Sequence, residues 1–291
     1  MRCRILVTDL DGTLLNRRGE VSQGNLESLD RARQSGIEVV FATGRSWIEC
    51  KMVAQAALGD GVAITAGGAA LHDVATGRCE DRIVISNDLV AHCTESLVNH
   101  GHLAHLLKDS TSAGYDYLLV GDADLDEASR WWFSVHPLET RAVLALDRDE
   151  RLRDEQLKHV LRVGTVAVAD ELARVAQAIR DEVPERLTLK HWPALVALGQ
   201  AGVDTHLLEI FDASVDKWRM ILRLCETRGI DPREVVTVGD GLNDIGMLRG
   251  AERSYVVANA EPNVAQCATR RAPDHDHDPI AFVVEEILRG Q

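Results

Sequence analysis

The first part of the chain alternates short apolar runs with segments whose apolar residues recur at helical spacing. The runs are typical of buried parallel strands, and Gly36 marks the end of the first helical segment. The segments are, in order, a strand at 4–10, a helix at 25–34, a strand at 37–42, a helix at 46–58 and a strand at 62–65. This alternation predicts a doubly wound, Rossmann-like α/β core with a parallel sheet.

The same alternation returns in the last part of the chain, with a different pattern between. The last part predicts strands at 206–211, 235–238 and 254–257 and helices at 217–228, 244–249 and 280–288. The middle predicts helices at 88–99, 127–135 and 171–182 and strands at 103–108, 117–120, 163–169 and 187–190. We therefore expect a core from residues 1–82 and 191–291, with 83–190 inserted as an α+β domain.

Charge and composition narrow the class of partner. The 291 residues include 46 acidic and 32 basic ones, giving a formal charge of −14, which disfavours binding to nucleic acid or an anionic membrane. A phosphate site in such a protein needs local positive charge or a metal. No apolar run approaches about 18 residues, the N-terminus lacks signal-peptide features, and the six cysteines form no CxxC pair. We expect a cytoplasmic protein with free thiols.

The first candidate for chemistry is the acidic pair at the end of the first strand, in the run Asp9-Leu-Asp11-Gly-Thr. Ligands of open α/β sheets bind at the carboxyl ends of strands, and side chains two apart lean to one side. One acid could serve as nucleophile and metal ligand while the other moves a proton. Taken alone, the run is better explained as a strand that ends in a solvated Asp-Gly turn.

Three further groups follow other predicted strands. Thr43-Gly44-Arg45 offers a hydroxyl and backbone N–H groups for phosphate oxygens. Gly239-Asp240-Gly-Leu-Asn243-Asp244 gathers two carboxylates and an amide, which suit a hard, oxygen-binding cation. Lys217 opens a helix and could supply the fixed positive charge that a phosphate site requires.

Together these motifs, in this order and at these strand ends, resemble the haloacid dehalogenase superfamily of phosphotransferases. Asp9-Leu-Asp-Gly-Thr-Leu resembles its first motif, Thr43-Gly-Arg its second, Lys217 its third and Gly-Asp240-Gly-Leu-Asn-Asp244 its fourth. An insertion between the second and third motifs implies the Cof-type sugar-phosphate phosphatases with a large α/β cap. The resemblance covers most of the core, and in the cap it is one of architecture only.

The resemblance implies a role for each matched residue. Asp9 would be the nucleophile, and Asp11 would protonate the leaving oxygen and then activate water against an aspartyl phosphate. Phosphate would be bound by Thr43, Gly44, Lys217 and Asn243. Mg²⁺ would be bound by Asp9, the backbone carbonyl of Asp11 and Asp240. Asp244 would either bind the metal directly or support the residues that do. The implied activity is Mg²⁺-dependent hydrolysis of a small phosphate ester.

Three features depart from the family pattern or invite another interpretation. Gly67-Gly68 stands where relatives usually have Asn-Gly, and Trp218 follows Lys217 where relatives usually have Gly. Near the C-terminus, His275 and His277 alternate with aspartates between two prolines. This loop is either a second metal site or an acidic surface loop, and its lack of a fixed scaffold favours the latter.

Two other functions stay open at the level of sequence. One is a phosphotransferase or a phosphomannomutase-like enzyme on the same fold, which transfers phosphate to a sugar hydroxyl instead of water. The other is a non-catalytic protein that binds a phosphorylated metabolite. The complete set of acidic, hydroxyl and lysine residues argues against the second, because drift removes such residues from a retired site.

Overall fold

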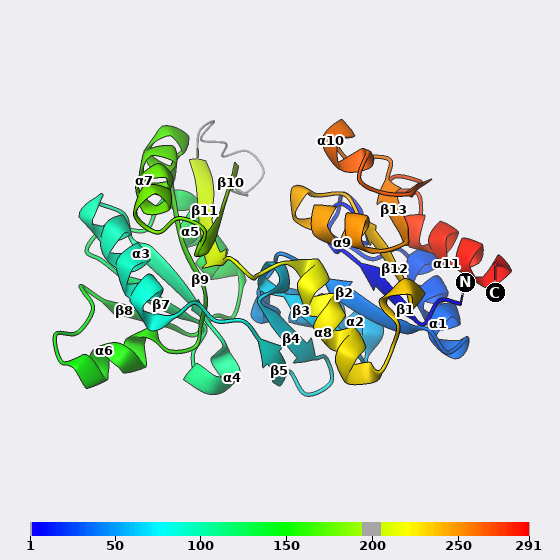
Figure 1. Ribbon diagram of the computed structural model, residues 1–291, viewed down its shortest axis with the longest axis horizontal. Helices are drawn as coiled ribbons and strands as arrows, with labels where there is room; N and C mark the ends of the chain where they lie inside the picture. The colour runs from blue at the N-terminus through cyan, green and yellow to red at the C-terminus, as the bar shows by residue number, and fades with distance from the viewer. Residues whose placement is uncertain (1, 194–204, 291) are drawn as a thin grey trace. The chain divides into compact units, whose positions relative to one another are not determined.

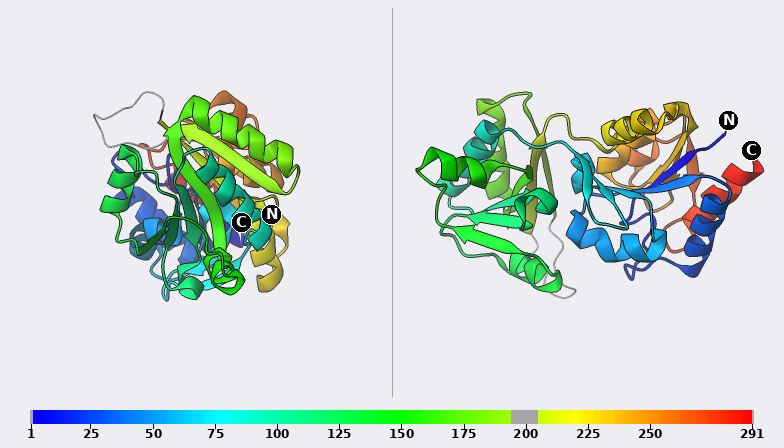
Figure 2. Two further views of the ribbon diagram at one scale, coloured as in Figure 1. Left: turned by 90° about the vertical axis from the view of Figure 1, so that its left-hand side faces the viewer. Right: turned by 90° about the horizontal axis from the view of Figure 1, so that it is seen from below.

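The computed structural model describes residues 2–193 and 205–290. The chain folds into two compact units, a core unit of Met1–Asp81 with Asp216–Gln291 and a cap unit of Arg82–Val215. In Figure 1 the core unit contains both ends of the colour range, and the cap unit contains the middle of it. Figure 2 shows the same two units from two further directions.

The core unit is built on one eight-stranded sheet in the order β14-β13-β12-β1-β2-β3-β4-β5. Neighbouring strands from β14 to β3 run parallel, whereas β4 pairs antiparallel with β3. The strands are β1 (Ile5–Thr8), β2 (Glu38–Ala42), β3 (Val62–Thr65), β4 (Ala70–Asp73), β5 (Cys79–Arg82), β12 (Val235–Gly239), β13 (Arg253–Val257) and β14 (Arg270–Ala272). The predicted doubly wound parallel core is therefore confirmed.

Helices cover both faces of the core sheet. The α helices are α1 (Gln23–Gln34), α2 (Trp47–Leu58), α8 (Lys217–Arg228), α9 (Ile245–Gly250), α10 (Pro262–Ala265) and α11 (Pro279–Arg289), with 3₁₀ turns η1 (Ala66–Gly68), η2 (Pro232–Glu234) and η3 (Leu242–Asp244). Residues of α1, α2 and α11 share one hydrophobic cluster with β1, β2, β12 and β13. On the other side, α8 packs near β3 and α9 near β12 and β13.

Short apolar strands form the centre of this sheet because they are buried on both faces. All four residues of β1 are buried, as are the four of β3 and the five of β12. The register places Thr8 of β1 opposite both Phe41 of β2 and Val238 of β12. The residues that follow these three adjacent strands consequently emerge at one edge of the sheet.

The cap unit contains a second, six-stranded sheet in the order β10-β11-β9-β6-β7-β8, antiparallel except between β7 and β8. Its strands are β6 (Ala104–Lys108), β7 (Tyr117–Val120), β8 (Thr140–Val143), β9 (Val160–Val168), β10 (Leu187–Pro193) and β11 (Thr205–Asp212). Its helices are α3 (Asn87–Asn99), α4 (Ser110–Ala113), α5 (Glu127–Val135), α6 (Glu150–Leu157) and α7 (Ala169–Glu182). Apolar residues of α3 and α7 pack on one face of this sheet.

The predicted boundary between 190 and 191 is wrong. Residues 206–211, assigned to the core from their apolar pattern, lie in β11, which pairs antiparallel with both β9 and β10 of the cap sheet. The chain re-enters the core unit only at Asp216. Leu208 and Ile210 explain the difference, because they are fully buried in the hydrophobic cluster of the cap. The other predicted boundary, between 82 and 83, lies one residue from the observed division.

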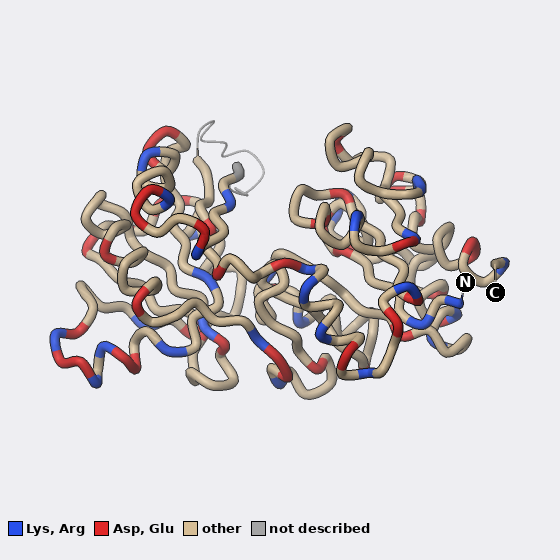
Figure 3. The backbone as a smooth tube through the Cα atoms, viewed as in Figure 1, with Lys and Arg blue, Asp and Glu red and all other residues tan. Residues whose placement is uncertain are grey.

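Charged residues of both signs are spread over each unit. Figure 3 shows Lys and Arg interspersed with Asp and Glu along the backbone of the core and of the cap. In the described part of the chain, no helix combines the length and apolar character needed to cross a membrane. All six cysteines are free thiols, as expected from their spacing.

Candidate active site

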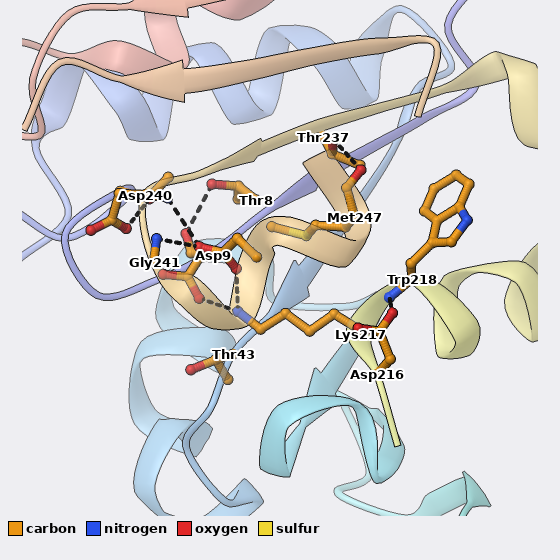
Figure 4. A network of polar contacts seen from close by, with 12 residues as sticks. Thr8, Asp9, Thr43, Asp216, Lys217, Trp218, Thr237, Asp240, Gly241 and Met247 are labelled. Carbon is orange, nitrogen blue, oxygen red and sulfur yellow. Dashed lines mark hydrogen bonds and ion pairs between the residues drawn. The ribbon is translucent and has the colours of Figure 1, made fainter. Parts of the chain in front are cut away.

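The order of strands in the doubly wound sheet brings the predicted motifs to one place. Asp9 follows β1, Thr43 follows β2 and Asp240 follows β12, and these three strands are neighbours. Lys217 is the first residue of α8, whose N-terminus is capped by the side chain of Asp216. Figure 4 shows the side chain of Lys217 extending from α8 toward Asp9.

Lys217 is the centre of the site. Its side chain is fully buried, and its Nζ donates hydrogen bonds of 2.6 Å to Oδ1 of Asp9 and of 2.6 Å to Oδ1 of Asp244. Burial alone would lower the pKa of this ammonium, but the charges of Asp244 and Asp9 outweigh it and raise the pKa above its usual value. Lys217 therefore stays positively charged although it is fully buried.

Asp244 is the second carboxylate that binds this cation. Its side chain is fully buried, and its Oδ2 accepts hydrogen bonds from the backbone N–H groups of Asp240, at 3.0 Å, and Gly241, at 2.9 Å. A Cβ on Gly239 would lie 2.6 Å from Cγ of Asp244, so only glycine leaves room there. Because both oxygens already accept hydrogen bonds, Asp244 is better suited to bracing Lys217 and the loop after β12 than to contacting a ligand.

Asp9 and Asp240 form the more open part of the acidic cluster. One carboxylate oxygen from each of Asp9, Asp240 and Asp244 lies within 4.8 Å of the others. Burial raises the pKa of Asp9 well above its usual range; Lys217 opposes this, while Asp244 and Asp240 add to it. Burial likewise raises the pKa of Asp240 to about 6, although a 2.6 Å hydrogen bond from the Thr13 hydroxyl opposes the shift.

The raised pKa values of Asp9 and Asp240 bear on whether the acidic cluster suits a metal ion. Among the described residues, the buried carboxylates of Asp9 and Asp244 and the partly buried one of Asp240 share one ammonium, so full ionisation leaves excess negative charge in a largely buried site. A divalent cation would relieve this repulsion, and carboxylate oxygens are the ligands that Mg²⁺ prefers. The residues therefore fit the magnesium ion that the sequence predicts.

Asp11 lies apart from the buried cluster. Its side chain is exposed, and the guanidinium of Arg45 binds it through both oxygens, with Nε of Arg45 2.8 Å from Oδ2. Arg45 belongs to the predicted Thr-Gly-Arg motif, but its pairing with Asp11 was not predicted. The pair connects the loop after β1 with the loop after β2.

The predicted phosphate ligands lie beside the acids. Thr43 is buried, and its hydroxyl accepts a hydrogen bond of 3.1 Å from the backbone N–H of Arg45. A Cβ on Gly44 would lie 3.3 Å from Nδ2 of Asn243, so the loops after β2 and β12 approach closely at these two residues. The structure thus brings Thr43, Gly44 and Asn243 to the edge of the sheet that carries Asp9.

The structure explains Trp218, one of the two departures from the family pattern, and shows why the second glycine of the Gly67-Gly68 pair, which the pattern shares, is required. Gly68, with a φ of +106°, packs against the backbone at the start of α8, where an added Cβ would lie 2.5 Å from the carbonyl carbon of Asp216 and 2.7 Å from the nitrogen of Lys217. Trp218 packs over Gly250 of α9, and Figure 4 shows its ring pointing away from the ammonium of Lys217.

The His-Asp loop near the C-terminus makes contacts with its own residues and with the start of the chain. Nδ1 of His277 lies 2.7 Å from Oδ1 of Asp274, and Asp276 pairs with Arg17 at 2.9 Å. The backbone N–H of His275 donates to Oδ1 of Asn259, at 3.0 Å. Sequence reasoning gave no role to Asn259 or to Thr13, although both bind groups beside the predicted acids.

The comparison with known families agrees with this geometry. A family model described as haloacid dehalogenase-like hydrolase matches residues 6–284. The chain belongs to the haloacid dehalogenase-like hydrolases. This confirms the family resemblance inferred from the motifs, and the phosphatases among its relatives agree with the expectation of a phosphoric monoester hydrolase.

Named relatives and solved structures extend the likeness over the full chain. The chain is 26% identical over 306 residues to 5-amino-6-(5-phospho-D-ribitylamino)uracil phosphatase YwtE of Bacillus subtilis, covering 100% of this chain and 99% of that protein. It is 25% identical over 300 residues to pyridoxal phosphate phosphatase YbhA of Escherichia coli, covering 99% and 100%. A crystal structure of a haloacid dehalogenase-like hydrolase from Bacteroides thetaiotaomicron matches with a TM-score of 0.78 at 22% identity, covering 98% and 100%.

The contact between Gly68 and α8 generates a prediction. Gly68→Ala should displace the start of α8, lower the free energy of unfolding by about 2 kcal/mol and weaken any activity that needs Lys217. Gly36→Ala is the matched control, since Gly36 also has a positive φ but no atom within 4 Å of an added Cβ. Urea unfolding and phosphate-ester hydrolysis would be measured on both variants. Equal loss of activity in the two would show that the Gly68 contact does not position Lys217.

Proposed function

We propose that the protein is a Mg²⁺-dependent phosphatase that hydrolyses a small phosphorylated metabolite through an aspartyl phosphate on Asp9. The observation that carries the proposal is the fully buried Lys217 between Asp9 and Asp244, at the carboxyl ends of β1 and β12. Phosphoryl transfer depends mainly on positioning and charge neutralisation; this arrangement supplies the positioning, and a bound cation would complete the neutralisation. When bound, Mg²⁺ would neutralise charge on the phosphoryl oxygens and be held by Asp9, Asp240 and the backbone carbonyl of Asp11.

The reaction would proceed in two balanced steps on residues of this chain. In the first, a carboxylate oxygen of Asp9 forms a bond to phosphorus, the ester P–O bond breaks, and Asp11 gives a proton to the leaving oxygen. In the second, Asp11 takes a proton from water, the water oxygen bonds to phosphorus, and the Asp9–phosphorus bond breaks to release phosphate. Thr43, Asn243 and Lys217 would bind phosphoryl oxygens throughout.

Asp9 is well placed for the role of nucleophile. Among the hydrogen bonds of the described residues, Oδ1 of Asp9 accepts from Lys217, and Oδ2 has no donor. Lys217 therefore fixes the orientation of the carboxylate while leaving the second oxygen able to react. The backbone carbonyl of Asp9 also accepts a hydrogen bond from the Thr8 hydroxyl, at 2.9 Å, which further limits movement of the residue.

The relatives indicate the substrate class that we propose. The names of two of them specify phosphate esters of small organic molecules, a ribitylaminouracil and pyridoxal. We propose a substrate of the same kind, such as a sugar phosphate or a related metabolite, in a soluble cytoplasmic protein. A phosphate-release screen over a panel of such metabolites with Mg²⁺ tests this. Transfer of the phosphoryl group to a sugar hydroxyl instead of to water would favour the phosphotransferase alternative.

Substitution of the two acids separates their roles. Asp9→Asn should abolish hydrolysis while preserving the fold, because the amide is nearly isosteric but a very poor nucleophile. Asp11→Asn should slow turnover by roughly 10²–10⁴-fold, the usual contribution of general acid–base catalysis. Steady-state kinetics and circular dichroism on both variants check the result. More than a few per cent of wild-type turnover in Asp9→Asn would reject its assignment, as would a rate within threefold of wild type for Asp11→Asn.

Metal dependence is expected from the excess negative charge of the acidic cluster. Activity should require Mg²⁺ and disappear in EDTA. Ca²⁺ should inhibit, since its larger and looser coordination misplaces the nucleophile and the phosphate.

Replacing His275 and His277 together with Ala should leave the Mg²⁺ requirement unchanged. Full activity in chelator would reject the metal proposal, and a shifted Mg²⁺ titration in the double variant would identify the C-terminal loop as a metal site.

We also propose that the cap unit determines which leaving group is accepted, because the core residues named above handle only the phosphoryl group. One face of the cap sheet is covered by α3 and α7. The other face carries polar groups, including the buried pair of Arg162 and Glu209. Lys190 lies opposite Glu209 in the sheet, with its ammonium 5.1 Å from the centre of the Phe211 ring.

The proposed role of the cap unit predicts a selective effect of Lys190→Gln. Loss of the cation should change kcat/KM for the best metabolite by more than tenfold, while p-nitrophenyl phosphate, which has little to recognise beyond phosphate, should change by less than threefold. Lys158→Gln is the control, because Lys158 is an exposed cap lysine paired with Glu155. Parallel kinetics on both esters decide the matter, and equal losses on the two would refute a role of Lys190 in specificity.

A further inference from the structure

The connection between β1 and α1 is bound at several points by residues from the C-terminal part of the chain. We call residues 9–22 the catalytic loop and residues 273–279 the C-terminal loop. Asp276 accepts a hydrogen bond of 3.0 Å from the backbone N–H of Arg17 and pairs with its guanidinium. Asp278 accepts from the hydroxyl of Ser22 at 2.5 Å. More than 250 positions separate these partners, so the contacts are tertiary.

A third contact reaches the catalytic loop directly beside Asp11. Nδ2 of Asn259 donates a hydrogen bond of 2.8 Å to the backbone carbonyl of Gly12. The other end of the same carboxamide is fixed, because Oδ1 accepts from the backbone N–H of His275 at 3.0 Å. The C-terminal loop thus sets which way the carboxamide points, and only this orientation presents a donor to Gly12.

Gly12 is a sensitive position for such a contact. Its φ of +74° favours glycine, and an added Cβ would lie 3.0 Å from Cγ of Asp240. The carbonyl held by Asn259 belongs to the peptide that joins Gly12 to Thr13. Asp11 lies one residue before this peptide, and Thr13, whose hydroxyl binds Asp240, directly follows it. Movement of this one peptide would therefore displace both the proposed acid and a proposed metal ligand.

From these contacts we propose that Asn259 is a positioning residue for the catalytic loop and that the C-terminal loop serves to orient it. The proposal rests on the proposed function, since it assigns Asn259 to holding Asp11 and Asp240 in register for hydrolysis. It also gives a purpose to the His-Asp loop, whose backbone N–H, and not its imidazoles, makes the contact with Asn259. In this role Asn259 acts through the Gly12 carbonyl and not by contact with substrate.

Two substitutions at one position test the donor specifically. Asn259→Ala removes the whole carboxamide, whereas Asn259→Asp keeps an acceptor for His275 but loses the donor to Gly12. Asn263→Ala is the matched control, because Asn263 is an exposed asparagine nearby whose side chain accepts a local hydrogen bond from the backbone N–H of Val264. All four proteins are examined by steady-state kinetics on p-nitrophenyl phosphate with Mg²⁺ and by hydrogen exchange of peptides covering residues 9–16.

Both Asn259 variants should lower kcat about five- to tenfold, equivalent to roughly 1–1.4 kcal/mol in the barrier, with KM within twofold of wild type. Both should also speed exchange in residues 9–16, while Asn263→Ala behaves as wild type. Wild-type kcat in Asn259→Asp, or slowed turnover without faster exchange, would overturn the proposal. An inactive wild-type protein would instead reject the proposed function, and exchange alone would then decide whether Asn259 holds the loop.

Discussion

The structure of the site depends on one buried ammonium. Lys217 lies between Asp9 and Asp244 with its side chain fully inaccessible to solvent. A buried charge is tolerated only when it is paired and hydrogen-bonded, so the carboxylates must approach it closely. This requirement explains why glycine occupies two nearby positions, since a side chain at Gly68 would collide with the backbone of α8 and one at Gly239 with Asp244. The glycines thus leave the space that the ion pairs of Lys217 require.

Much of this arrangement follows from local sequence patterns. The central strands were predictable because short apolar runs buried on both faces leave a clear signal, as in β1 and β3. The acids and Lys217 were found because their residue types and their order along the chain are unusual together. Similarity to known hydrolases then confirmed the family. The fold itself brings the carboxyl ends of the central strands to one edge of the sheet. Any residue that directly follows a central strand can therefore be placed at that edge from the sequence.

Other features could not be read from local patterns. β11 has the apolar pattern of a strand in either sheet, and its antiparallel pairing with β9 and β10 is decided by partners distant in sequence. The bonds from Arg45 to Asp11, from Thr13 to Asp240 and from Asn259 to Gly12 join polar residues that are common on protein surfaces. Nothing in the spacing of such residues indicates which of them meet, because the contacts depend on loop conformations that tertiary packing selects.

The charge of the whole chain and the charge of the site impose the same requirement. With a formal charge of −14, the protein repels phosphate esters in bulk solution, and the buried acids add local repulsion. Lys217 cannot remove this repulsion, because its single charge is already shared by Asp9 and Asp244. The repulsion that Lys217 leaves in place is evident at Asp240. Burial and the neighbouring Asp244 raise the pKa of Asp240 to about 6, even though it accepts a hydrogen bond from Thr13. A cation bound by Asp9 and Asp240 would relieve this repulsion, which connects the electrostatics of the acidic cluster to the metal dependence proposed for the reaction.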